Sequence, residues 1–219
     1  MSIKELISRE ITPLKPQCLV KEALEMMDEW KVNTLPVVDN DIFVYLLTEK
    51  NLSDEINPSL PVSNIQGKHF CIHEQSHLFD LLHIMSQNEL DLLPVVNDSN
   101  HYLGFITAKA LLKQLAVICD AETPGAIIQM EMHHRDFMLS DLAHIAEQNN
   151  AHIMNLFTYP DKKTGKLQIL VKVDQEDATY FLRSLERFNY RVIAHYHHDS
   201  MTDELIQQRM EELLYYIEM

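Results

Sequence analysis

Five histidines stand in two short clusters, and their imidazole nitrogens are potential ligands for a transition metal. His133 and His134 are adjacent, and His195, His197 and His198 follow later in the chain. Neutral imidazole is a common zinc ligand, but neither cluster has the HExxH spacing that places two histidines on one helix face. Solvated surface histidines are therefore the simpler interpretation, and a metal site shared between two subunits is the alternative.

Three cysteines, Cys18, Cys71 and Cys119, offer thiol chemistry. Their number is odd and no CxxC spacing occurs, so neither a disulfide framework nor a local zinc site is indicated, and a reducing cytoplasm is expected. Cys18 aligns with Ser76, which we expect to cap a helix. A thiol at a helix N-terminus can have a lowered pKa. An inert, partly buried Cys18 is nevertheless the simpler interpretation.

Glycine-dependent catalytic loops cannot be assembled from this chain. Only four glycines exist, at positions 67, 104, 125 and 165, which excludes GxGxxG and Walker loops. GxSxG is absent as well. Because no catalytic constellation is recognisable, we expect a protein that is not an enzyme.

The composition indicates a globular protein with an acidic surface. Hydrophobic residues make up 46% and charged residues 23% of the 219, and the formal net charge is −15. Excess negative charge repels phosphate backbones and anionic membranes, which argues against nucleic-acid and membrane partners. The first ten residues, MSIKELISRE, contain no apolar signal core, and no run approaches the roughly 20 apolar residues of a membrane span.

The tetrapeptide Leu-Pro-Val-Val occurs twice, at residues 35–38 and 93–96, and reveals an internal repeat. The first copy is preceded by LVKEALEMMDEWKVN and the second by HLFDLLHIMSQNELD. Apolar residues occupy matching positions at helical spacing in both segments. Each copy is therefore predicted to begin with an amphipathic helix that leads into a strand.

A second apolar strand follows each tetrapeptide and ends at a threonine. The runs IFVYLL and HYLGFI end at Thr48 and Thr107 respectively. A threonine in this position can cap the next helix through its hydroxyl. Each copy is thus predicted to contain a helix, a strand, a turn, a second strand and a short helix, after a short extended segment.

This order resembles the tandem CBS module. Members of that family carry a PVVD-like strand, followed by glycine, two apolar residues, Thr or Ser, two further residues and Asp. The resemblance covers residues 1–118, with repeats over about 1–56 and 57–118. It implies that the repeats pack pseudo-symmetrically through their sheets and leave two clefts. In many relatives these clefts bind adenosine nucleotides, with Thr or Ser facing the phosphates and Asp accepting from the ribose hydroxyls.

The resemblance also implies a set of candidate nucleotide-binding residues: Thr12, Leu35, Pro36, Thr48, Asn51, Cys71, Leu93, Pro94, Thr107 and Ala110. Neither copy keeps the ribose-binding aspartate, because Asn51 and Ala110 replace it. Asparagine can still accept a hydrogen bond, whereas alanine cannot. The glycine of the pattern survives as Gly104 but is Tyr45 in the first copy, where a ring can fill the cleft. We expect weakened binding, with the first cleft better in polarity and the second in space.

Residues 122–199 have a different pattern of strands and helices. The predicted order is strand AIIQMEMHH, helix FMLSDLAHIAEQN, strands HIMNLFTYP and KLQILVKVD, helix QEDATYFLRSLERFN and strand RVIAHYHH. This βαββαβ order is typical of the ferredoxin-like arrangement. Placed after a CBS pair, it resembles an ACT-type regulatory domain, and the whole chain resembles proteins associated with acetoin utilisation. Its first and last strands would be antiparallel neighbours, which separates the two histidine clusters.

The ligand loop of the ACT family is not preserved. That family has a glycine in the first strand-to-helix loop, where an amino acid approaches the backbone, but the loop here reads HHRDFMLSD. We therefore expect a structural or dimer-forming role for this domain.

Residues 200–219, SMTDELIQQRMEELLYYIEM, are predicted to form an amphipathic helix. Its polar face is acidic, so its apolar stripe is expected to cover the protein itself or a second subunit rather than a membrane.

The predicted fold class is α+β: a CBS-domain pair, a ferredoxin-like ACT-type domain and a C-terminal helix. We expect a non-enzymatic regulatory protein that senses a small-molecule effector, an adenosine nucleotide such as AMP, ADP or ATP. It would signal through a homodimer to an unidentified protein partner. Two alternatives stay open: an assembly scaffold whose clefts are closed by side chains such as Tyr45, and a metal-binding protein that uses the histidines.

Overall fold

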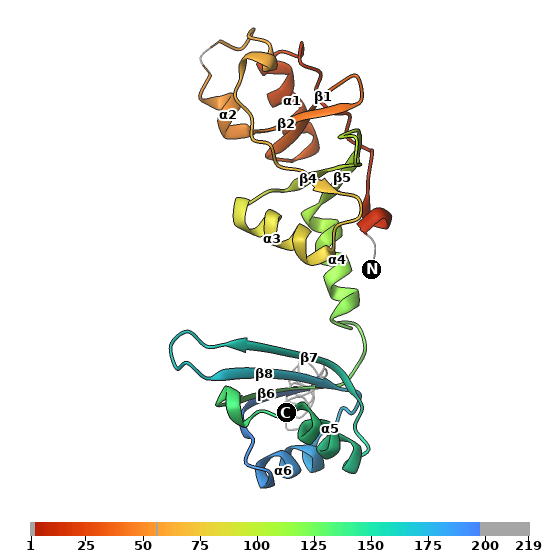
Figure 1. Ribbon diagram of the computed structural model, residues 1–219, viewed down its shortest axis with the longest axis vertical. Coiled ribbons are helices and arrows are strands. Elements are labelled where there is room, and N and C mark those ends of the chain that lie inside the picture. The colour runs from red at the N-terminus through yellow and green to blue at the C-terminus, as the bar shows by residue number, and fades with distance from the viewer. Residues whose placement is uncertain (1–2, 56, 198–219) are drawn as a thin grey trace, which may run out of the picture. The chain divides into compact units, whose positions relative to one another are not determined.

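The computed structural model describes residues 3–55 and 57–197. The chain divides into two compact units, with the boundary between Leu115 and Ala116 (Figure 1). No helix within the described residues is long and apolar enough to cross a membrane. The predicted helix at 200–219 lies outside the described residues.

The first unit contains the two copies of the repeat. After the 3-10 turn η1 (Ile3–Leu6), the first copy consists of α1 (Val20–Trp30), β1 (Thr34–Asp39), β2 (Ile42–Thr48) and α2 (Glu49–Ser53). The second consists of η2 (Val62–Asn64), β3 (Ile72–His73), α3 (Leu78–Asn88), β4 (Leu92–Val96), β5 (Tyr102–Thr107) and α4 (Ala108–Ile118). The order of elements predicted for each copy is confirmed.

The length predicted for the last helix of each copy is right for α2 and wrong for α4. The five residues of α2 are soon followed by Asn57-Pro58, and proline cannot continue a helix. The eleven residues of α4 are mostly strong helix formers, and Leu111 anchors them in the core. The repeat therefore diverges after its threonine.

Both copies have the same strand pairing. β1 pairs antiparallel with β2 and β4 with β5, and each pair has a register shift in its tetrapeptide, at Val37/Val38 and at Val95/Val96. The segments before the helices cross to the other copy, since Ser8 bridges Phe105 and Lys68 bridges Leu46. The strands of both copies bury their side chains in one hydrophobic cluster, which contains Leu35, Val37, Leu93 and Val95. Full burial of such a side chain contributes about 1.5–3 kcal/mol, and here each copy supplies the apolar surface that the other needs.

The second unit has a single antiparallel sheet in the order β7-β8-β6-β9. Its elements are β6 (Ala126–Met132), η3 (His134–Asp136), α5 (Leu139–Gln148), β7 (Ile153–Pro160), β8 (Leu167–Val173), α6 (Thr179–Arg187) and β9 (Arg191–His197). Both α5 and α6 lie on the same side of the sheet (Figure 1). The alternate residues of β8 predicted to face the core are buried there with Phe181 and Leu185 of α6, and they are Leu167, Ile169, Val171 and Val173.

Candidate ligand-binding cleft

The two repeats meet at residues that occupy equivalent positions in the duplicated sequence. Asn33 and Asp91 are such a pair, 58 positions apart, and the backbone N–H of Asn33 donates to the Asp91 carboxylate at 3.0 Å. Beyond the other ends of the tetrapeptide strands, Ile42 forms an antiparallel bridge with His101, its equivalent in the second copy. Contacts between equivalent residues lie on a symmetry axis. A pseudo-two-fold axis therefore passes close to both pairs.

Asn33 links three segments at one end of this axis. Its carbonyl accepts from the backbone N–H of Glu49 at 2.7 Å, and its side-chain amide donates to the Glu89 carbonyl at 3.4 Å. Two hollows lie beside Asn33, and both are lined by Asn33 and Glu49.

The first hollow, which we call the threonine cleft, has a volume of about 300 Å³. It is lined by Asn33, Thr34, Thr48, Glu49, Lys50, Lys68, Asn88, Glu89 and Leu90. Thr34 is only 1% exposed, and its hydroxyl oxygen has no hydrogen-bond partner. The side-chain oxygen of Asn33 is also buried without a partner. Buried polar atoms are normally satisfied, so these two oxygens are the unusual feature of the cleft.

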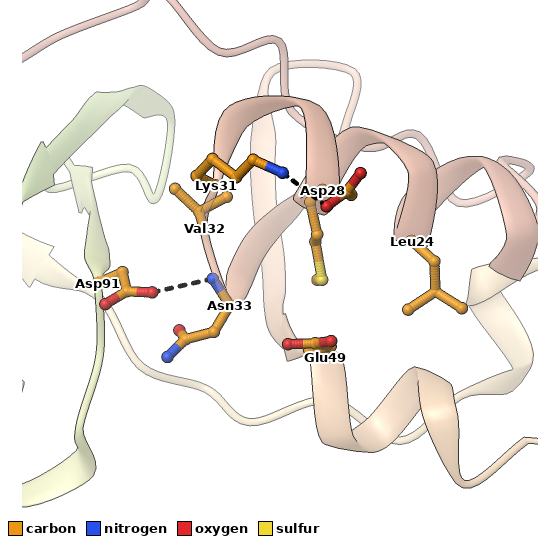
Figure 2. A pocket seen from close by; sticks show the side chains of 8 residues that line it. Leu24, Asp28, Lys31, Val32, Asn33, Glu49 and Asp91 are labelled. Carbon is orange, nitrogen blue, oxygen red and sulfur yellow. Dashed lines mark hydrogen bonds and ion pairs between the residues drawn. The ribbon is translucent and has the colours of Figure 1, made fainter.

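The second hollow, which we call the acidic hollow, has a volume of about 350 Å³ (Figure 2). Its apolar lining residues are Leu24, Met27 and Val32, and its charged ones are Asp28, Lys31, Glu49 and Asp91. The Lys31 ammonium lies 2.8 Å from Asp28, so these two charges neutralise each other. Within residues 3–55 and 57–197, no group of three His, Cys, Asp or Glu side chains is placed to hold a metal ion.

Thr48 caps α2 as predicted, and Asn51 completes the cap. The Thr48 hydroxyl donates to the Asn51 side-chain oxygen at 2.6 Å and accepts from the Asn51 backbone N–H at 3.2 Å. The same Asn51 oxygen accepts from the backbone N–H of Thr48 at 3.2 Å. In the second copy Thr107 likewise accepts from the Ala110 backbone N–H at 3.1 Å, but alanine returns no contact. The polar atoms of Thr48 and Asn51 are thus engaged mainly with each other.

Of the ten positions predicted to bind nucleotide, Thr48 lines the threonine cleft and none of the others lines either hollow. Thr12 is exposed, and Cys71 and Ala110 are half-buried. Burial raises the pKa of the Cys71 thiol. The remaining aliphatic positions are buried, namely Leu35, Pro36, Leu93 and Pro94. Their side chains form core rather than cleft surface.

Sequence reasoning missed Thr34, Lys68 and Asn88, which line the threonine cleft. A signal for Thr34 was available, because this polar residue opens a strand whose next four residues are apolar, while the second copy begins its strand with Leu92. Lys68 and Asn88 have no such signal, since Lys68 reaches this place through its bridge with Leu46, and Asn88, the last residue of α3, reaches it only when the two copies pack together.

The ring of Tyr45 packs away from both hollows. It lies against Gly67, where an added Cβ would be 2.3 Å from the ring, and its hydroxyl donates to the Val62 carbonyl at 2.9 Å. Burial raises the pKa of this hydroxyl. The ring thus fixes the segment that leads into the second repeat.

The capping position expected for Ser76, and by alignment for Cys18, is wrong. The N-cap of α1 is Leu19 and that of α3 is His77, so neither Cys18 nor Ser76 occupies the capping position. Burial and the neighbouring Glu22 carboxylate raise the pKa of Cys18 to about 11. The structure therefore supports the inert, partly buried Cys18 that the sequence favoured.

The two histidine clusters lie at opposite ends of β6. His133 and His134 follow its last residue, whereas His197 pairs with Ala126, its first. A third hollow of about 370 Å³ is lined by His133 and by Glu131, Met132, Asp136, Lys166, Phe188 and Asn189. The Glu131 carboxylate there accepts from Lys166 at 2.7 Å, which lowers the pKa of Glu131. Glu131, the least exposed charged residue of this hollow, is therefore already paired.

A comparison with protein families assigns the first unit. The family model of the CBS domain matches residues 3–58 and 62–117, just over half of the chain. The chain belongs to the CBS domain family. Each match contains one copy of the repeat, so the threonine cleft and the acidic hollow both lie where the two CBS repeats meet.

Several curated proteins share the CBS pair. Inosine-5'-monophosphate dehydrogenase of Methanocaldococcus jannaschii is 29% identical over 112 residues, which are 50% of this chain and 23% of that protein. The uncharacterised protein MJ1232 of the same organism is 29% identical over 107 residues, 48% of this chain and 36% of that protein. The chain therefore spans roughly a third or less of these curated relatives. Among solved structures, a CBS domain pair/ACT domain protein from Thermotoga maritima has a TM-score of 0.49 at 21% identity, covering 56% of this chain and 99% of that one.

Proposed function

We propose that the CBS pair is a regulatory module that binds an adenosine-containing nucleotide, such as AMP, ADP or ATP, in the threonine cleft. Thr34 carries the proposal, because this residue lines the cleft and its buried hydroxyl has no hydrogen-bond partner. Leaving a buried hydroxyl unsatisfied costs about 1–3 kcal/mol. A polar ligand in the cleft would recover that free energy.

The charges of the cleft suit the parts of a nucleotide. Lys50 and Lys68 can attract phosphate, and the Asn88 amide can hydrogen-bond a base edge. Glu49 can accept from ribose hydroxyls, as the motif aspartate does in the family. The volume of about 300 Å³ is at the lower end for small-molecule sites, so we expect a mononucleotide rather than a dinucleotide.

The ligand would act by shifting the arrangement of the CBS pair, residues 1–118, and not through catalysis. The βαββαβ order of residues 122–199 supports an ACT-like domain, which we propose relays this change through a homodimer to a protein partner in the cytoplasm. We propose that residues 200–219 form the last helix of this second half of the chain.

The test is a thermal-shift screen of the full chain with AMP, ADP and ATP, each near one hundred times a micromolar dissociation constant. Binding of that strength adds about 2.7 kcal/mol to stability and raises the melting temperature by several degrees. Thr34→Val should abolish the shift, and Thr107→Val should retain it. Thr48→Val is a poorer probe because it also removes the cap of α2. If only Thr107→Val abolishes the shift, the nucleotide binds instead in the cleft of the second repeat.

The second candidate is an assembly scaffold that binds no nucleotide. It is favoured by the hydrogen bonds between Thr48 and Asn51, which engage these two side chains with each other rather than with a ligand. A wild-type protein that shows no shift with any of the three nucleotides would support the scaffold and reject the sensor. Metal content after gentle purification tests the remaining alternative, a histidine site shared between subunits.

A further inference from the structure

The sheet of the second unit has one face covered by helices and a second face, here called the open face, on which no described helix packs, although Gln168 and Lys172 on it are only 6% and 8% exposed. Both α5 and α6 lie on one side, and no other described helix of that unit packs on the opposite side (Figure 1). In antiparallel strands, directly paired residues share a face. The register therefore places three rows across β7, β8, β6 and β9 on the open face, namely Asn155-Lys172-Ile127-Tyr196, Phe157-Leu170-Gln129-Ala194 and Tyr159-Gln168-Glu131-Arg191.

Polar groups on this open face satisfy one another. The Gln129 amide donates to Gln168 at 3.3 Å, and the Gln168 amide donates to Glu131 at 3.3 Å. Arg191 also donates to Glu131, at 3.2 Å, and the Lys172 ammonium donates to the backbone carbonyl of Asp120. A layer that covers this face therefore does not need to supply polar partners for these groups.

The apolar side chains on the open face, in contrast, leave part of their surface exposed. Phe157 is 40% exposed and Tyr196 is 55% exposed, and Leu170 and Ile127 lie between them in the paired rows. Large apolar side chains left exposed on one face of a sheet can mark a place where another element docks.

We propose that the open face is the docking surface of the chain's own residues 200–219. β9 ends at His197, directly after Tyr196 of the first row. Three residues can span about 10 Å, which is the distance between packed layers. The following segment is therefore tethered within reach of the face.

The sequence of this segment matches the surface in pattern and length. Its apolar residues recur at helical spacing, at Leu205, Ile206, Met210, Leu213, Leu214 and Ile217. A helix over 201–219 would be about 28 Å long, enough to cross strands of roughly 23 Å. The acidic residues Glu204, Glu211 and Glu218 would then remain in water.

A second copy is the competing occupant. A short tether holds the segment at an effective concentration of order millimolar. At micromolar protein, this favours docking within one chain over docking between chains.

The test is disulfide formation under mild oxidation in the full chain, with linked peptides identified by mass. Leu170→Cys is combined with Met210→Cys on the apolar stripe or, as the matched control, with Gln208→Cys on the polar side. We expect a disulfide within one chain for the Met210 pair, and at least tenfold less for the Gln208 pair. A disulfide found only between chains, or equal yields for both pairs, would overturn the proposal.

A second variant avoids dependence on cysteines. Met210→Glu should increase binding of a hydrophobic dye severalfold, and Gln208→Glu should leave it unchanged, while circular dichroism shows that both remain folded. Unchanged dye binding in folded Met210→Glu would also overturn the proposal.

Discussion

The two CBS repeats share a backbone but differ at the positions that decide whether their clefts can hold a polar ligand. Thr34 in the first repeat corresponds to Leu92 in the second, and Asn51 corresponds to Ala110. The first repeat therefore has a buried hydroxyl without a partner, whereas Leu92 is buried with no polar atom to satisfy. Duplication conserved the elements that pack the core and left each cleft free to change.

The same comparison explains Tyr45. At the equivalent position Gly104 has φ +141°, and the backbone of Ser8 passes close to it. In the first repeat the large and the small residue are exchanged. The strand carries Tyr45, and the crossing segment beside it carries a glycine, Gly67. A large residue on one side of the crossing requires a small one on the other.

The largest effect is expected from Gly104→Ala. A Cβ there would lie 2.5 Å from the Ser8 carbonyl oxygen, at a φ that side chains rarely adopt, so the variant's free energy of unfolding should fall by about 3 kcal/mol or more.

Gly67→Ala should lower the free energy of unfolding by about 1–3 kcal/mol. Part of this loss should be recovered when Gly67→Ala is combined with Tyr45→Ala, because the clash is chiefly with the ring. Urea unfolding followed by the fluorescence of Trp30, the only tryptophan, measures these changes in the first unit. Additive losses in the Gly67→Ala, Tyr45→Ala double variant would contradict this account.

Cys18 and Ser76 occupy equivalent positions, and only Cys18 has an acid close enough to hydrogen-bond its side chain, Glu22 at 3.4 Å. Because the pKa of Cys18 is raised from about 9 to about 11, its thiolate is scarce at pH 8. Alkylation by iodoacetamide should be about 100-fold slower than for a free thiol and should rise about tenfold per pH unit until pH approaches 11. Glu22→Gln should speed the reaction. Ordinary reactivity at pH 8 would refute the assigned environment.

Exchanging the residues at positions 34 and 92 sharpens the comparison of the clefts. Without ligand, Thr34→Val should stabilise the protein by about 1 kcal/mol, since it removes an unsatisfied buried hydroxyl. Leu92→Thr should destabilise it by about 2 kcal/mol by creating one. The same urea titration measures both. A loss of stability in Thr34→Val would mean that the hydroxyl has a partner in solution.

The smallest effect is expected at the caps. Asn51→Ala makes the first repeat like the second and should cost about 0.5–1 kcal/mol, because two hydrogen bonds at the start of α2 are lost. Ala110→Asn should stabilise α4 by a few tenths of a kcal/mol. Equal and negligible effects in thermal unfolding would show that Asn51 adds nothing to the Thr48 cap.

Much of the architecture follows from local pattern. The duplicated tetrapeptide, the helical spacing before it and the threonine after it predicted the elements of both repeats, because each depends on residues close in the chain. The alternation in β8 predicted its buried face for the same reason. The length of α4 and the caps at Leu19 and His77 were missed, since small local differences decide where a helix begins and ends.

The repeat, the order of the elements and the replacement of the motif aspartate by Asn51 and Ala110 all follow from the residues alone. The tertiary structure decided which side chains face the cleft. It placed Thr34, Lys68 and Asn88 together, buried Leu35 and Leu93 in the core, and turned Tyr45 onto Gly67. These choices depend on contacts between residues that are far apart in the chain, and such contacts leave no periodic pattern in the sequence.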